Sequence, residues 1–346
     1  MGHGKLKKFA ENETFRCLLQ PSAESVLVKD GSKALVLRDH PVKGHWLEQM
    51  FSSKGPIVLE LGCGKGDYTI ALAERHPEMN FIGVDIKGAR LWKGAKYATE
   101  KGLTNVAFLR TRIEFIGAFF GEGEVSEIWL TFSDPQLKSE NARLTSPLFL
   151  ERYRAFLAPG GVVHLKTDSR FLHEYTRSVV RANNLPLLAS STDIYAPGTD
   201  RSGASLRDPS QPDGWAPPSY MAEGGHGPGA ASAGSCNGVD WEEVTGVQTF
   251  YESMFLKMGL PITYMAFTLD GHEGPFVHPT DFDADYWRAA EGPRRTFSHQ
   301  PSKAAAEPVE EAEQTEQQEN KRPKSSVISG VCFIVVVVIF TLAQFL

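Results

Sequence analysis

Cysteine pairs, spaced metal ligands and an N-terminal apolar stretch are all missing from this sequence of 346 residues. The four cysteines are widely scattered and form no CxxC pair, which argues against a zinc site and against a disulfide framework. The histidines show no metal-ligand spacing, so no metal is expected. The first residues are polar and basic, without the apolar region of a secretory signal. We therefore expect a cytoplasmic protein.

A strong overall charge is also missing. The formal net charge is −6, but residues 198–245 account for −5 and residues 302–346 for −2, which leaves the rest close to neutral. A nucleic-acid partner would then be bound through local basic patches. Candidate positions share a basic side chain on a predicted helix or near the N-terminus, although a solvated helix face explains each one alone: Lys5, Lys7, Lys8, Lys87, Arg90, Lys93, Lys96, Arg152 and Arg154.

Strand and helix patterns alternate from residue 57 to residue 183. Strands are predicted at 57–61, 80–85, 105–110, 125–132, 162–168 and 262–269. Helices are predicted at 45–51, 68–74, 88–101, 147–157, 171–183 and 247–258. Strands separated by helices indicate an α/β fold with a parallel sheet and right-handed crossovers, and the last strand can pair antiparallel at one sheet edge.

Composition divides the chain into five parts. Residues 1–53 are expected to be an N-terminal arm, and 54–196 with 244–295 to be the main domain. Residues 197–243 are expected to be a disordered insertion, because 15 of the 42 residues in 197–238 are Gly or Pro. Residues 296–326 are predicted to be a disordered linker.

Residues 327–346 form a run of twenty without a charge, preceded by Lys321, Arg322 and Lys324. Twenty helical residues span about 30 Å, the thickness of a bilayer core. By the positive-inside tendency, this pattern predicts a C-terminal transmembrane helix whose preceding domain faces the cytosol. A terminal helix packed on a partner, or a segment foreign to the protein, are the alternatives.

A glycine-dense turn, Gly62-x-Gly64-x-Gly66, follows the first predicted strand. Such a turn lets backbone approach either a dinucleotide or S-adenosylmethionine. Asp67 occupies the place of the third glycine in a dinucleotide fingerprint. Glu60 would suit the ammonium of a methionine moiety and repel a pyrophosphate. Asp85, at the tip of the second strand, could accept bonds from two ribose hydroxyls, so S-adenosylmethionine is favoured.

Acids also end two later strands. Asp134-Pro135 follows the fourth strand, and Asp168 follows the fifth, where ligands bind in an open parallel sheet. Lys138, Asn141 and Arg143 form a polar loop that could meet phosphates or a base edge. An ordinary Asp-Pro turn and strand capping explain these residues equally well. Thr249 and Glu252 fit a helix capping box, or a hydroxyl and a carboxylate that face a ligand.

Taken together, these motifs resemble the bacterial tRNA (guanine-N7-)-methyltransferases over about residues 54–193 and 244–269. The resemblance rests on Glu60-Leu-Gly-Cys-Gly-Lys-Gly, Gly83-Val-Asp85-Ile, Phe132-Ser-Asp134-Pro-Gln-Leu-Lys138, Leu165-Lys-Thr-Asp168 and Thr249-Phe-Tyr-Glu252. It implies a Rossmann-like class I methyltransferase, with a mostly parallel seven-stranded sheet, an antiparallel edge strand and helices on both faces. The chain departs from the family's usual residues at Gln136, where Trp is frequent, and at Arg112-Ile113, where an acid usually contacts adenine.

The resemblance also implies roles for individual residues. It makes Asp134 the catalytic residue. Cofactor contacts are implied at Glu60, Gly62, Gly64, Asp85, Arg112, Ile113 and Asp134. Substrate contacts are implied at Lys138, Asp168, Thr249, Phe250, Tyr251 and Glu252.

The expected activity is methyl transfer from S-adenosylmethionine to N7 of a guanosine in the variable region of tRNA. Two other hypotheses fit the sequence. One is a methyltransferase that acts on a small molecule, a protein or a lipid, which a membrane tail would favour. The other is an RNA-binding relative that has lost turnover.

Overall fold

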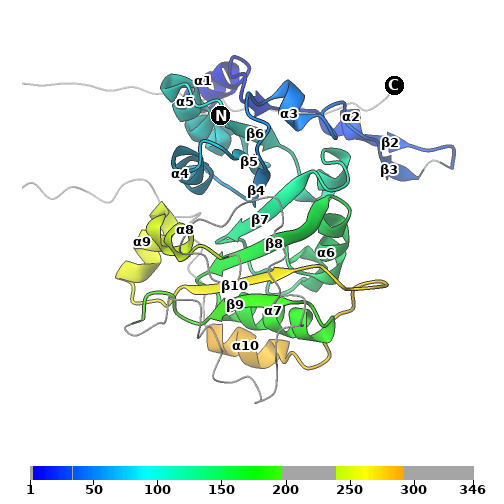
Figure 1. The fold of residues 1–346 in the computed structure, drawn as a ribbon, viewed down its shortest axis with the longest axis vertical. Helices are drawn as coiled ribbons and strands as arrows, with labels where there is room; N and C mark the ends of the chain where they lie inside the picture. The colour runs from blue at the N-terminus through cyan, green and yellow to red at the C-terminus, as the bar shows by residue number, and fades with distance from the viewer. Residues whose placement is uncertain (1–2, 33, 197–238, 292–346) are drawn as a thin grey trace, which may run out of the picture. The chain divides into compact units, whose positions relative to one another are not determined.

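Eight strands form a single sheet in the order β1-β6-β5-β4-β7-β8-β10-β9 (Figure 1). The computed structural model describes residues 3–32, 34–196 and 239–291, which all lie in one compact unit, Met1–Arg294. The strands are β1 (Leu18–Leu19), β4 (Ile57–Leu61), β5 (Asn80–Asp85), β6 (Val106–Arg110), β7 (Val125–Thr131), β8 (Leu157–Thr167), β9 (Leu187–Ser191) and β10 (Thr263–Thr268). A separate hairpin pairs β2 (Leu27–Lys29) with β3 (Leu35–Leu37).

The pairing confirms the predicted class and changes two details. Every pairing between two of the strands β1, β4, β5, β6, β7 and β8 is parallel. The count is eight rather than seven, because Leu18–Leu19 of the N-terminal region pair with β6. The antiparallel strand β10 lies one place in from the edge rather than at it, because β9 pairs along its outer side.

Helices cover both faces of the sheet. They are α1 (His3–Asn12), α2 (Ala23–Val26), α3 (Trp46–Gln49), α4 (Asp67–Arg75), α5 (Gly88–Lys101), α6 (Pro147–Arg154), α7 (Arg170–Ala182), α8 (Trp241–Gly246), α9 (Phe250–Lys257) and α10 (Ala284–Glu291), with short 3₁₀ turns η1 (Ile113–Ala118) and η2 (Glu140–Ala142). Successive side chains of a strand point to opposite faces of the sheet, and each face has its own hydrophobic cluster. Leu59 belongs to a buried cluster that includes residues of α6 and α7, whereas Val58 belongs to one that includes residues of α4, α5 and α8.

One helix is shorter than its sequence pattern. The segment predicted as a helix over 147–157 is helical only to Arg154, and β8 already begins at Leu157. The Ala158–Gly161 stretch, whose proline and glycines usually end a helix, lies within the strand. The register with β7 shifts there, between Val125 and Glu127. Gly160 has φ +76°, a value that glycine adopts without steric cost.

The chain from Val239 onward has defined structure earlier than its composition indicated. Residues 239–243 fall within the predicted insertion of 197–243, but Val239 and Trp241 are buried and Asp240 caps α8. Residues 197–238, the predicted linker 296–326 and the predicted anchor 327–346 lie outside the described residues. Within the described part of the chain, no helix has the length and apolar character needed to cross a membrane.

Phe108 of β6 packs against the glycine turn. Its side chain is fully buried, and its ring faces three positions that have no side chain. A Cβ added at Gly66 or Gly94 would lie 2.6 or 2.5 Å from this ring, and one at Gly83 would lie 2.9 Å from it. These contacts exclude any larger residue, so the turn, α5 and β6 approach closely.

Gly94→Ala should therefore destabilise the protein although alanine favours helices. Its Cβ would lie 2.5 Å from Phe108 and 2.8 Å from the Lys65 carbonyl. Overpacking costs about 1–3 kcal/mol, whereas the gain in helix propensity is about 1 kcal/mol. Denaturant unfolding should show a lower free energy of unfolding. Gly117→Ala is the matched control, because nothing lies within 4 Å of its Cβ; equal stability of both variants would contradict the packing argument.

Candidate active site

The sheet has a topological switch at β4. The chain passes from β4 to β5 and β6 on one side, then crosses to β7 and β8 on the other. Since these strands are parallel, their carboxyl ends meet at one edge. Ligands of open α/β sheets bind in the crevice at such a switch point.

The glycine turn leads from the end of β4 into α4. Gly62, Gly64 and Gly66 have φ values of +85°, +60° and +75°. A Cβ at Gly62 or Gly64 would meet nothing within 4 Å, whereas one at Gly66 would strike Phe108. The first two glycines therefore leave exposed backbone for a ligand at the N-terminus of α4, and the third serves packing.

Asp85 is fixed against this turn. Its Oδ2 accepts a hydrogen bond from the Gly64 amide at 3.1 Å, and its Oδ1 accepts one from the Lys87 amide at 2.7 Å. The side chain is 7% exposed. The carboxylate is thus held at the tip of β5, next to Gly62 and Gly64.

A cleft of about 320 Å³ opens at these strand ends. It brings together four of the predicted cofactor residues, namely Gly62, Asp85, Arg112 and Ile113. The sequence analysis missed the other lining residues: Ile86, Thr111, Glu114, Ala142, Leu144 and Phe149. Ile86 carried a usable signal, because it directly follows the acid of a strand end, and it is 51% exposed despite its apolar side chain.

Glu60 lies at the same switch point but is 5% exposed. Its Oε2 accepts hydrogen bonds from the Thr69 amide at 2.9 Å and from the Thr69 hydroxyl, and its Oε1 accepts one from the Thr131 hydroxyl at 2.5 Å. Burial raises the pKa of this carboxyl to about 7, although these donors act in the opposite direction. The side chain links β4 to α4 and to β7.

Asp134 follows β7 and is exposed. Its Oδ1 accepts a hydrogen bond from the Gln136 amide at 2.9 Å. Phe132 and Gln136, on either side, have φ values of +51° and +46°, which are unusual for residues other than glycine. Such backbone strain often occurs at functional sites. Lys138, four residues further on, is also exposed.

Asp168 occupies the corresponding place after β8. Thr131 and Lys166 are partners in the parallel register of β7 and β8, so Asp134 and Asp168 follow neighbouring strand ends. The Asp168 side chain is half-buried. The next residue, Ser169, caps α7 by accepting a hydrogen bond from the Leu172 amide at 3.1 Å.

Arg143 was expected in a polar loop that could meet phosphates or a base edge, but its side chain is buried. It is 3% exposed, and its guanidinium carbon lies 4.7 Å and 4.2 Å from the ring centres of Phe171 and Tyr175. Burial lowers the pKa of this side chain from its ordinary value. Arg143 therefore stabilises the loop by stacking on aromatic rings and is not presented to a phosphate or a base edge.

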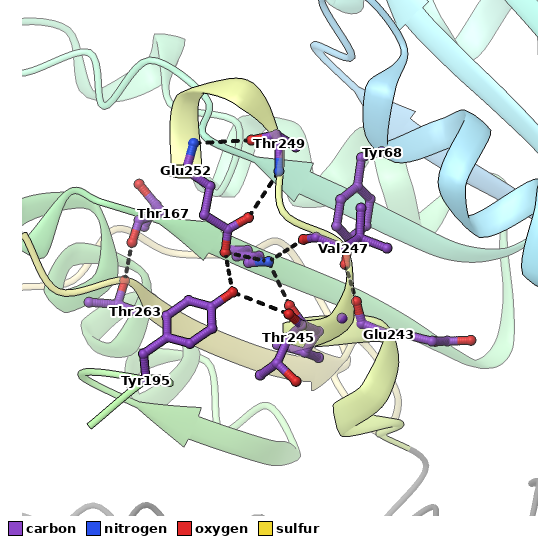
Figure 2. A network of polar contacts seen from close by, with 12 residues as sticks. Tyr68, Thr167, Tyr195, Glu243, Thr245, Val247, Thr249, Glu252 and Thr263 are labelled. Atoms are coloured by element: carbon purple, nitrogen blue, oxygen red, sulfur yellow. Dashed lines mark hydrogen bonds and ion pairs between the residues drawn. The ribbon is translucent and has the colours of Figure 1, made fainter. Parts of the chain in front are cut away.

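The four residues from Thr249 to Glu252 divide into two pairs (Figure 2). Thr249 and Glu252 form a capping box: the Glu252 amide donates to Thr249 Oγ1 at 3.2 Å, and the Thr249 amide donates to Glu252 Oε2 at 3.3 Å. Phe250 and Tyr251 are 60% and 40% exposed. Lys65 Nζ lies 5.3 Å from the centre of the Phe250 ring, which places the start of α9 beside the glycine turn.

Comparisons with known proteins agree with this geometry. The family described as "Putative methyltransferase" matches residues 54–202. The tRNA (guanine-N(7)-)-methyltransferase of Christiangramia forsetii is 42% identical over 267 residues, which are 77% of this chain and 97% of that protein. The enzyme of the same name from Porphyromonas gingivalis is 40% identical over 257 residues, or 74% of this chain and 89% of that protein.

One solved structure, titled "Structure of an antibiotic related Methyltransferase", is more distantly similar: it is 14% identical, with a TM-score of 0.41, over 72% of this chain and all of that one. The two relatives named above are matched over 97% and 89% of their own length. On that basis, the chain belongs to the tRNA (guanine-N(7)-)-methyltransferase family.

Proposed function

We propose that this protein transfers the methyl group of S-adenosylmethionine to N7 of a guanosine in the variable region of tRNA. The observation that supports this most directly is the cleft at the ends of β4, β5 and β6. Ala142 and Leu144, of the loop that begins at Asp134, line this cleft. The proposal therefore places the base at Asp134, next to a cofactor bound in the cleft.

The lining of the cleft fits S-adenosylmethionine. Asp85 would accept bonds from the ribose hydroxyls, and Ile86 and Ile113 would contact the adenine. Gly62 and Gly64 leave room for the methionine moiety, and the Glu60 carboxylate would face its ammonium. Arg112 would line the part of the cleft that holds the adenine. When bound, the cofactor supplies an electrophilic methyl group on a sulfonium.

The residues beyond the cleft would hold the base. Guanine N7 has an in-plane lone pair and needs no deprotonation, so the main task of the protein is in-line positioning, for which effective molarities can reach about 10⁵ M or more. Asp134 would accept bonds from the donor edge of the guanine and offset the positive charge that develops on the ring.

The RNA chain would meet a mixed surface. Lys138, four residues after Asp134, and Asp168, which follows the neighbouring strand, are proposed to contact the nucleotide. Phe250 and Tyr251 present exposed rings on which a base can stack. To reach Asp134, the guanosine would turn out of its stack, which costs a few kcal/mol.

Asp134→Asn should lower kcat about 100-fold or more, which is the usual loss when one electrostatic contact to a developing charge is removed. Labelled S-adenosylmethionine and unmodified tRNA measure the rate, and nucleoside analysis locates the methyl group. Asp39→Asn, on an exposed residue that pairs with Lys43 on the surface, is the control. Transfer by the wild type to another atom or another class of substrate would reject the proposal.

Asp85→Asn should weaken binding of S-adenosylhomocysteine about tenfold to 100-fold, since one carboxylate that accepts hydrogen bonds is worth about 1.5–3 kcal/mol. Titration calorimetry measures the change. The Asp39→Asn variant should bind as the wild type does. Unchanged affinity in Asp85→Asn would show that Asp85 does not bind the ribose of the cofactor.

We further propose that residues 327–346 anchor the protein to a membrane with its enzyme domain in the cytosol. The support is the charge-free length of this run and the basic residues before it. Full-length protein should sediment with membranes after cell fractionation, and a form that ends at residue 320 should stay in the supernatant. Recovery of both forms in the supernatant would contradict the anchor.

A further inference from the structure

Lys166 of β8 is a buried cation that bonds to Glu252 and Val247, two of the residues labelled in Figure 2. Its Nζ lies 2.7 Å from Glu252 Oε1, and both side chains are 0% exposed. Nζ also donates hydrogen bonds to the carbonyls of Val244 at 2.5 Å and Val247 at 3.1 Å. One ammonium therefore holds the end of α8, the connection after it and the first turn of α9.

The backbone of the same residue holds the other side of the site. The Lys166 carbonyl accepts a hydrogen bond from the Phe132 amide at 2.8 Å. Phe132 stands two residues before Asp134, and its ring centre lies 5.8 Å from that of Phe255 in α9. Lys166 thus connects the Asp134 turn with the helix that carries Phe250 and Tyr251.

Two tyrosines complete the network. The Tyr195 hydroxyl donates a hydrogen bond to Glu252 Oε1 at 2.7 Å. The Tyr68 hydroxyl of α4 donates to the Glu243 carbonyl at 2.8 Å, and the Tyr68 ring lies 5.4 Å from Lys166 Nζ. The Glu252 carboxylate therefore bonds to Lys166, to Tyr195 and to the amide of its own capping box, and its side chain has no exposed surface.

We propose that Lys166 is a positioning residue for methyl transfer, and that Glu252 acts on the tRNA through its pair with Lys166 rather than by contact. This inference rests on the proposed function. The pair sets the place of the first turn of α9, and with it the rings of Phe250 and Tyr251 relative to Asp134. The cofactor cleft takes no part in the network.

The length of α9 explains why it needs this support. It has eight residues, and a helix of this length is marginal by itself in water. Removing one member of a buried ion pair leaves an uncompensated charge, whereas replacing both by neutral residues does not. Lys166→Met keeps the backbone bond to Phe132 and removes only the hold on α8 and α9. Glu252→Gln keeps a side chain that can form the capping box.

The test uses the full-length protein with Lys166→Met, Glu252→Gln and the double variant. Lys166→Met should lower kcat/KM for tRNA about 100-fold, as a displacement of about 1 Å can, and leave the affinity for S-adenosylhomocysteine unchanged. The double variant should recover most of the loss. If Glu252 contacted the RNA, the double variant would be no better than the worse single variant, and the proposal would fail. Lys29→Met, an exposed lysine of the β2–β3 hairpin, should behave as the wild type.

Hydrogen exchange gives a readout that does not depend on activity. In Lys166→Met, amides of residues 250–258 should exchange faster while those of β4 and β5 keep their protection. Loss of protection throughout the sheet, with loss of cofactor binding, would show a general structural role and overturn the proposal. Unchanged exchange in α9 would also overturn it.

The milder Tyr195→Phe removes one bond to Glu252 and should shift exchange in α9 in the same direction as Lys166→Met. Tyr195→Phe is the substitute test if Lys166→Met does not fold. Exchange in α9 of Tyr195→Phe that equals the wild-type exchange would then contradict the proposal. A wild type that binds cofactor but methylates no tRNA would reject the proposed function alone, because the exchange data would still decide whether Lys166 positions α9.

Discussion

Parallel pairing of the central strands is the constraint on which the site depends. Because β4, β5, β7 and β8 run in the same direction, four strands from distant parts of the chain end at one edge. An acid stands in or just after the end of each strand, namely Glu60, Asp85, Asp134 and Asp168. No local interaction along the chain could bring these four together; the backbone hydrogen bonds of the sheet do so.

Four carboxylates of the site region differ in environment, and the environment separates their uses. Glu60 is buried and bonded to two threonines, and its pKa is raised to about 7. Asp85 is held by two backbone amides at the rim of a cleft. Asp134 is exposed on a strained turn. Glu252 is enclosed with a cation. Residue type alone therefore says little about what each acid does.

Local patterns predicted much of the fold. The strand, glycine turn and helix from Ile57 to Arg75 were recognisable because their periodicity and turn residues are contained in one short stretch. The strand from Leu157 was missed at its start, since a Pro-Gly-Gly sequence normally ends an element, and only the pairing with β7 extends it. The short β1 was missed because its two residues are ordered by β6 and not by their own pattern.

The site shows the same division. Glu60, Gly62, Asp85 and the Thr249–Glu252 box could be placed from spacing and from the family resemblance. The burial of Arg143 against aromatic rings and the ion pair of Lys166 could not. Both depend on contacts between segments tens of residues apart, and a lysine or arginine in sequence is far more often exposed.

The bond between Tyr195 and Glu252 also brings together the two chain segments on either side of residues 197–238. Tyr195 stands just before that interval, and α8 and α9 follow it. A stretch whose ends are already held side by side can grow or shrink at small thermodynamic cost, because each doubling of its length adds only about 0.6 kcal/mol of closure entropy. The architecture therefore permits wide variation in length at this point while the reacting groups keep their places.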